Sequence, residues 1–140
     1  MTAGDTGQAM SQENVEVVRR TLDAFLSGDV ETALSFYDPD VEWDGTNLPD
    51  GQIGRGHEAI MQHLRRWAAQ WDEWTVEVER IVDGRSDRVV AFLRERGRSA
   101  SGLNMDEVHA EVYEVRGGKI VRRQGFSDPN DGLEAVGLRE

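Results

Sequence analysis

The chain has 140 residues, a formal net charge of −11 and no cysteine. The acid excess argues against nucleic acids and anionic membrane surfaces as partners, because both are negatively charged. The lack of cysteine excludes disulfides, thiolate nucleophiles and cysteine-ligated zinc. Neither a signal peptide nor a membrane-spanning run is recognisable, so a cytoplasmic location is expected by default.

The N-terminal part of the chain predicts a tail followed by a helix. Residues 1–10 are small and polar, and a disordered tail is predicted there. One domain is expected over residues 11–140, a length that can bury its own core. Ser11 is expected to cap the first helix, whose apolar residues recur at helical spacing until Gly28 ends it.

The next part of the chain predicts two more helices around a short strand. Asp29 is a suitable cap for a short helix, which Pro39 ends because the residue before a proline avoids helical geometry. A short strand is expected at 41–43, followed by a glycine-rich loop over 44–56. A third helix over 57–71 carries one apolar stripe, which includes two tryptophans.

From residue 74 onward the hydrophobic period changes from helical to alternating, which predicts strands. Gly117 and Gly118 suit a hairpin turn, since glycine tolerates positive φ at both positions. Helices gathered before an antiparallel meander indicate an α+β fold rather than an alternating α/β fold. The expected strands are 75–84, 88–102, 104–116 and 119–127, and a short helix follows at 130–136.

Four segments of the chain resemble, in order, blocks of the SnoaL-like branch of the nuclear transport factor two-like superfamily. The likeness covers about residues 12–138, and four ordered blocks together make it a strong signal. The segments are ENVEVVRRTLDAFLSGDVETALSFYDPDVEW, GRGHEAIMQHLRRW, VVAFLRERGRSASG and VYEVRGGKIVRRQGFSDPNDGLEAVGL.

The resemblance implies a cone-shaped α+β fold. A strongly curved antiparallel sheet would wrap around the long third helix, with two further N-terminal helices and an internal pocket. Members commonly form homodimers through the sheet. The family includes polyketide cyclases, ketosteroid isomerase, scytalone dehydratase, limonene epoxide hydrolase and pure binding modules, so the fold alone does not set the function.

Strand alternation indicates which side chains line such a pocket. In the strand 104–116 one face combines His109 and Glu111 with Tyr113, and this face is expected to point inward. Alternation leaves the orientation of strand 88–102 open, and Arg94 is chosen as its inward candidate. The resemblance places inward the face of the last strand that holds Ile120, Arg122, Gln124, Phe126 and Asp128.

Asp128 is the first candidate for catalysis. In the SnoaL-like cyclases an acid after the last strand acts as general acid/base, and Asp128 falls near that motif position. A carboxylic acid at the rim of an apolar pocket has a raised pKa, which suits proton transfer. The alternative is that Asp128, immediately before Pro129, caps the terminal helix.

His109 is the second catalytic candidate, because histidine transfers protons near neutral pH. The alternative is a histidine with only a structural role. Trp43, Arg94, Glu111, Tyr113 and Phe126 are the expected substrate-binding residues. His57 and His63 show no metal-ligand spacing with His109, and His63 is expected to face solvent. No metal and no cofactor are expected.

The leading hypothesis is a cofactor-free cyclase, isomerase or dehydratase that acts by acid–base catalysis. Its partner would be a hydrophobic, oxygenated small molecule of polyketide-like or steroid-like character. Two alternatives stay open at this point. One is a small-molecule binding or accessory protein without turnover, and the other is a dimeric interaction module with a vestigial pocket.

Overall fold

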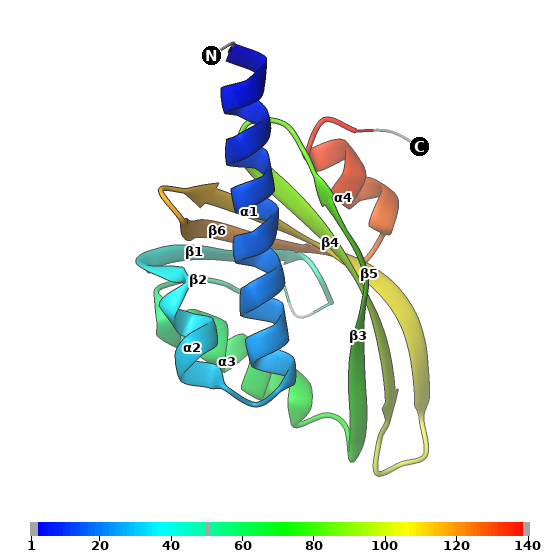
Figure 1. Ribbon diagram of the computed structural model, residues 1–140. Helices are drawn as coiled ribbons and strands as arrows, with labels where there is room; N and C mark the ends of the chain where they lie inside the picture. The colour runs from blue at the N-terminus through cyan, green and yellow to red at the C-terminus, as the bar shows by residue number, and fades with distance from the viewer. Residues whose placement is uncertain (1–2, 50, 139–140) are drawn as a thin grey trace.

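The computed structural model describes residues 3–49 and 51–138. Helices and strands follow one another along the chain as Figure 1 shows. The elements are α1 (Ala3–Leu26), α2 (Val30–Ser35), β1 (Tyr37–Asn47), β2 (Ile53–Arg55), α3 (His57–Ala68), β3 (Glu73–Asp83), β4 (Arg88–Arg98), β5 (Asn104–Arg116), β6 (Lys119–Phe126) and α4 (Pro129–Ala135).

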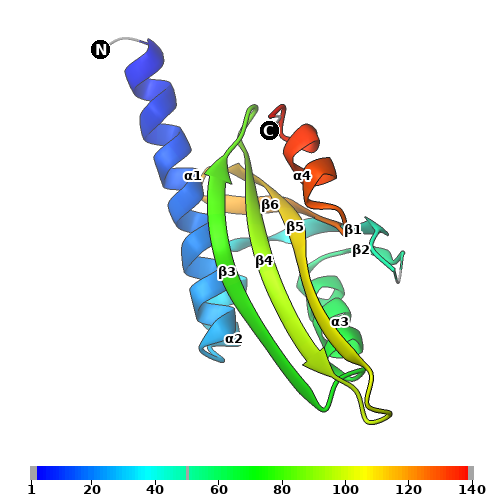
Figure 2. The same cartoon turned by 90° about the vertical axis from the view of Figure 1, so that its right-hand side faces the viewer.

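All six strands form one curved sheet in the order β2-β1-β6-β5-β4-β3. Strands β3, β4, β5 and β6 pair with one another in antiparallel fashion, whereas β1 pairs with β6 in parallel, so the sheet is mixed. Helices α1 and α3 lie on the inner side of the curve, and α4 covers the outer side (Figure 2). The expected α+β class with a strongly curved sheet is confirmed, and the sheet is not closed.

The two sides of the sheet hold separate hydrophobic clusters. The inner cluster joins β4 and β5 residues such as Leu93 and Tyr113 to Val18 of α1 and Ile60 of α3. The outer cluster lies under α4 and contains Val90, Phe92, Ala110, Val112, Phe126, Leu133 and Val136. Strands that are buried on both faces lose clear alternation, which is why β4 alone does not reveal its inner face.

Strand β1 is longer than the predicted strand 41–43. It begins at Tyr37, where Tyr37 pairs with Ile120 of β6, and it runs to Asn47. The predicted loop 44–56 also contains β2, which pairs with β1. The pairing of β1 with β6 joins segments far apart in sequence, so local propensity alone underestimates the length of β1.

Helix α1 begins at Ala3 and not at Ser11. The prediction of a disordered tail over residues 1–10 therefore differs from the structure for residues 3–10, while residues 1–2 lie outside the described part. The first turns extend past the sheet (Figure 1). No proline interrupts residues 3–11, so the backbone can continue the helix through Ser11.

The glycine turn between β5 and β6 is confirmed. Gly117 and Gly118 adopt φ values of 57° and 78°, the pair of positive angles that a two-residue hairpin turn needs. Within residues 3–49 and 51–138, no helix has the length and apolar character required to span a membrane.

Candidate active site

A cavity of about 640 Å³ opens on the inner side of the sheet. This volume lies within the usual range for small-molecule sites, about 300–1,000 Å³. Most of its lining is aliphatic or aromatic, contributed by α1, α3 and β3, including Leu22, Phe25, Leu64, Trp67, Trp74 and Val76. The cavity is therefore suited to a hydrophobic ligand, and charged side chains from β4, β5 and β6 form one of its walls.

That polar wall is a row of four charged side chains from three adjacent strands, which we call the ionic chain: Glu95 of β4, His109 and Glu111 of β5, and Arg123 of β6. All four line the cavity. Strand pairing explains their alignment, because His109 lies opposite Leu93, Glu111 opposite Gly125, and Tyr113 opposite Arg123. Paired residues share a face, so the register itself assembles the row.

Contacts within the ionic chain are continuous. Nδ1 of His109 lies 3.3 Å from Oε2 of Glu95, and its Nε2 lies 3.1 Å from Oε1 of Glu111. Arg123 donates from Nε and Nη2 to the two oxygens of Glu111, each at 3.2 Å. Side-chain exposure is only 3% for Glu111 and 5% for Arg123, so this pair is shielded from water.

Glu111 is held as a carboxylate. Burial opposes its charge, but Arg123 and His109 outweigh this effect and lower the pKa of Glu111 from 4.5 to about 2. For Arg123, burial likewise opposes the charge, yet the neighbouring Glu111 keeps its pKa well above the ordinary value. Each buried charge is therefore compensated by an opposite charge in direct contact.

His109 faces a carboxylate at each ring nitrogen. A neutral imidazole has one acceptor nitrogen, whose lone pair would repel a carboxylate oxygen, so this geometry favours the doubly protonated ring. Burial opposes the charge of His109, but the hydrogen bond to Glu111 and the charges of Glu111 and Glu95 raise its pKa.

For Glu95, in contrast to Glu111, the effect of burial on the pKa is larger than that of the neighbouring charges. Burial raises its pKa, and the positive charge of His109 offsets only part of this effect. Its Oε1 accepts hydrogen bonds from the indole nitrogens of Trp67 and Trp74, both at 3.1 Å. A carboxyl group with a raised pKa beside a protonated imidazole is a combination suited to proton transfer.

At its other end the ionic chain is anchored to the core. Nη1 of Arg123 donates to the Tyr37 hydroxyl at 3.1 Å. The guanidinium carbon of Arg123 also lies 5.6 Å from the ring centre of Trp43 and 5.5 Å from that of Tyr113. These contacts fix Arg123 in an aromatic setting, which favours a delocalised guanidinium.

Two of the sequence-predicted residues, His109 and Glu111, therefore lie together at the cavity wall, and their roles there stay predictions. Tyr113 is fully buried beside Arg123 and does not line the cavity. Trp43 is only 2% exposed and stacks against His63, with ring centres 4.2 Å apart. His63, expected to face solvent, is instead buried and lines the cavity in front of Trp43.

The prediction that Phe126 faces inward is wrong. A register shift between Glu114 and Val115 leaves Val121 as an extra residue in β6. Ile120 thus faces the inner core as expected, but every residue after the bulge changes face. Phe126 joins the outer cluster under α4, and Arg123, which the sequence interpretation missed, takes the inner position.

Arg94 also lies on the outer face. It donates to both oxygens of Asp106, at 2.9 and 3.0 Å, and is not part of the cavity lining. Glu95, its neighbour, points inward in its place. The Ser99–Leu103 hairpin could have revealed this, because pairing Arg98 with Asn104 puts Leu93 opposite His109.

Asp128 is the N-cap of α4. Its side chain is exposed and accepts a hydrogen bond from the backbone N–H of Asn130 at 2.9 Å. Pro129 occupies the first turn of the helix, where its missing N–H has no cost. Asp128 does not line the cavity, although Ser127 does, so its position agrees with the helix-cap alternative.

A metal site would need ligands grouped around one point. Within the described part of the chain, no group of three His, Asp or Glu side chains is arranged to hold a metal ion. The ionic chain is instead a row. Glu95 and Glu111 contact different ring nitrogens of His109, and Arg123 contacts Glu111. The ionic chain is thus a row of ion pairs, hydrogen-bonded between His109 and Glu111 and between Glu111 and Arg123.

Comparison with known proteins agrees with this architecture. The profile of the SnoaL-like domain family matches residues 18–123, and the chain belongs to that family. Uncharacterized proteins of Mycobacterium tuberculosis and Mycobacterium bovis are 32% identical over 120 residues, which is 83% of this chain and 90% of theirs.

Solved structures share the fold at lower identity. TerC, co-crystallized with polyporic acid, superposes with a TM-score of 0.71 at 23% identity, covering 89% of this chain and 98% of TerC. An LEH-like epoxide hydrolase of Mycobacterium tuberculosis gives a TM-score of 0.64 at 19% identity, covering 89% of this chain and 90% of the hydrolase. The protein is thus a pocket protein of the SnoaL-like family.

Proposed function

We propose that this protein is a cofactor-free enzyme that moves a proton on a hydrophobic, oxygenated small molecule. The observation that carries the proposal is the position of Glu95 and His109, in contact with each other at the polar wall of an apolar cavity. Glu95 is the proposed general base and His109 the proposed stabiliser of negative charge. TerC and the epoxide hydrolase support the use of this fold for organic ligands.

Charge balance explains why the two residues suit this reaction. With His109 protonated, the ionic chain contains two carboxylates and two cations and is electrically neutral. A neutral ligand enters without a charge penalty, and burial of an uncompensated ionic group is avoided. The apolar lining keeps water away, which strengthens each electrostatic contact.

The proposed step is removal of a proton from a carbon next to a carbonyl group. The C–H bond breaks, its electron pair stays on the ligand as an enolate, and the proton moves to Oε2 of Glu95. The ionic chain then carries one net positive charge, which offsets the negative charge of the enolate. Glu95 then delivers a proton to an atom of the ligand, so the reaction needs no cofactor, and in deuterium oxide exchange of the Glu95 proton with solvent before this delivery introduces deuterium.

Deuterium exchange tests the proposal without knowledge of the natural substrate. We choose β-tetralone, a bicyclic ketone, and follow loss of its α-proton signals by NMR in deuterium oxide. The wild-type protein should exchange these protons faster than buffer, and Glu95→Gln should return the rate to that of buffer. Glu114→Gln is the matched control, because Glu114 is on β5 but points to the other face, where it contacts Arg88.

Binding without turnover is the second candidate function. It is favoured by the degree to which the carboxylates of the ionic chain already have partners within the protein, as structural networks do. If β-tetralone binds in the cavity but its protons exchange no faster than in buffer, this second function replaces the first.

A further inference from the structure

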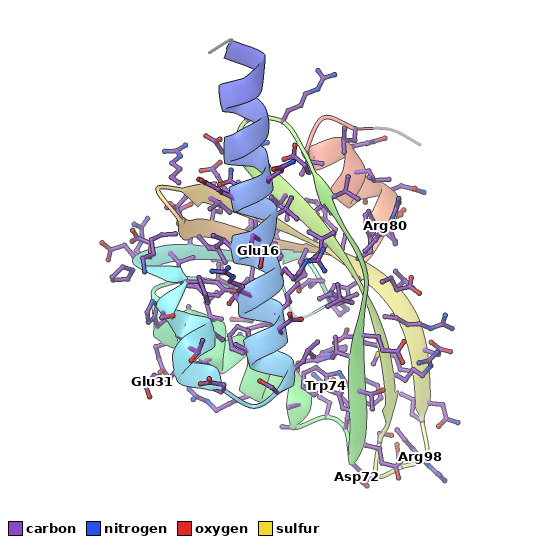
Figure 3. All side chains as sticks on the ribbon, in the orientation of Figure 1. Glu16, Glu31, Asp72, Trp74, Arg80 and Arg98 are labelled. Atoms are coloured by element: carbon purple, nitrogen blue, oxygen red, sulfur yellow. The ribbon has the colours of Figure 1, made fainter. Side chains whose placement is uncertain are left out.

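Glu95 receives two indole hydrogen bonds on one oxygen atom. Trp67 comes from α3 and Trp74 from β3, and each indole nitrogen lies 3.1 Å from Oε1 of Glu95. Figure 3 shows Trp74 on the side of β3 opposite to Arg80, which stacks on Phe92 of the outer cluster. Donors from two elements, α3 and β3, thus converge on a single carboxylate oxygen of β4 at the cavity wall.

The two indole donors give the two oxygens of Glu95 different hydrogen-bonding environments. A carboxylate oxygen accepts about two hydrogen bonds, and Oε1 already has two. Oε2 instead lies 3.3 Å from Nδ1 of His109, a contact that uses one of its two acceptor directions. The indoles therefore decide which oxygen can take a proton from a ligand.

The tryptophans are themselves held in place. Trp74 lies opposite Gly97 in the β3–β4 pairing, which puts it diagonal to Glu95 on the same face. Trp71 packs edge-on against Trp67, with ring centres 5.7 Å apart. A Cβ atom on Gly97 would lie 2.8 Å from the Trp71 ring, so a larger residue there would displace Trp71 from its place beside Gly97.

We infer that Trp67 and Trp74 are positioning residues that act through Glu95: together they immobilise Oε1 and turn Oε2 toward His109 and the ligand. This inference rests on the proposed function and deepens it. From the sequence, Trp67 belongs to the apolar stripe of the third helix and Trp74 stands at the start of a strand. Their indole N–H groups give them a second role, as hydrogen-bond donors to the carboxylate form of Glu95.

Other charged groups near Glu95 must be considered in any titration. They face it from β5, β6 and α3, and are His109, Glu111, Glu107, Arg123, His63 and Arg65. His109 contacts Oε2, and the two indoles contact Oε1. Removing an indole donor should therefore change Glu95 directly, because a lost hydrogen bond to a carboxylate favours its protonated form.

The first test uses the intact wild-type protein. The indole N–H resonances of Trp67 and Trp74 should shift with pH along the same curve as the side-chain carboxyl carbon of Glu95. Trp71 is the internal control, because its indole nitrogen is buried without a hydrogen-bond partner among the described residues. Indole resonances of Trp67 and Trp74 that ignore the Glu95 titration would overturn the inference.

The second test uses substitutions. Trp67→Phe and Trp74→Phe should each raise the pKa of Glu95 by about one unit and shift the pH profile of β-tetralone exchange equally. Trp71→Phe should leave both unchanged. Equal effects of all three substitutions would indicate a merely structural role. If the NMR titrations behave as expected but no exchange occurs, the proposed function fails while the positioning role of the indoles stands.

Discussion

Nε2 of His109 lies 3.1 Å from Oε1 of Glu111, two residues further along the same strand and on the same face. Because Arg123 contacts the same carboxylate, Glu111 bridges two cations in a nearly water-free setting. The bridge holds His109 in its charged form beside Glu95. It is therefore the structural basis of the proposed chemistry.

Removing the Glu111 charge should destabilise the fold. Glu111→Gln leaves Arg123 buried without its partner, and breaking a buried ion pair in this way typically costs about 3–5 kcal/mol. Urea denaturation measures the loss. Glu114→Gln, on the same strand but outside the cavity, should change the free energy of unfolding by about 1 kcal/mol or less. Equal losses in the two variants would contradict the bridging role.

The stability contributed by Glu111 should depend on pH. Its pKa is about 2 in the folded protein against 4.5 ordinarily, so the carboxylate stabilises the fold above about pH 4.5. This contribution, of order 3 kcal/mol, is lost as the pH falls toward 2. The difference in unfolding free energy between wild type and Glu111→Gln should therefore shrink over that window. A constant difference would show that Glu111 is not held as a carboxylate.

Phe126 should matter for stability and not for the ligand. It lies 7% exposed in the outer cluster under α4, on the far side of the sheet from the cavity. Phe126→Ala should lower the free energy of unfolding by about 3–5 kcal/mol, as for other buried aromatic truncations. Calorimetry gives this loss, and β-tetralone affinity of the folded variant should stay at the wild-type value. Weakened binding with little loss of stability would favour an inward Phe126.

Substitutions of Asp128 distinguish the role of a helix cap from that of a catalytic acid. Asp128→Asn retains a capping side chain and should preserve both stability and β-tetralone exchange. Asp128→Ala should cost about 0.5–2 kcal/mol of stability through loss of the α4 cap, again with exchange retained. Loss of exchange in the asparagine variant, with its fold intact, would return Asp128 to the active site.

The fold was largely predictable because element order and the four family-like segments agree with each other. The inward face of β5 was also predictable, since His109, Glu111 and Tyr113 alternate without interruption. Alternation fails in β6 because the extra residue Val121 moves every later side chain of the strand to the other face of the sheet. A bulge depends on the pairing of two strands and leaves no local signal in either.

Glu95 and its two indole donors were missed for a different reason. Both faces of β4 are buried, so Glu95 carries no mark of its direction within the strand. Trp67 fits the apolar stripe of a helix and Trp74 fits a strand. Their shared hydrogen-bond acceptor, Glu95, lies 28 residues from Trp67 and 21 residues from Trp74. The β4–β5 register could be read from the Ser99–Leu103 hairpin, but the approach of the two indoles to Glu95 depends on how β3 and α3 pack against β4.

The central claim is that His109 is a doubly protonated ring between two carboxylates, with Glu95 as its partner at the cavity wall. Nitrogen NMR of selectively labelled histidine tests this most directly, because protonated and unprotonated ring nitrogens resonate far apart. At neutral pH both nitrogens of His109 should be protonated, and Glu95→Gln should lower the pH at which the proton is lost. A neutral His109 ring with one bare nitrogen, unaffected by Glu95→Gln, would contradict the account.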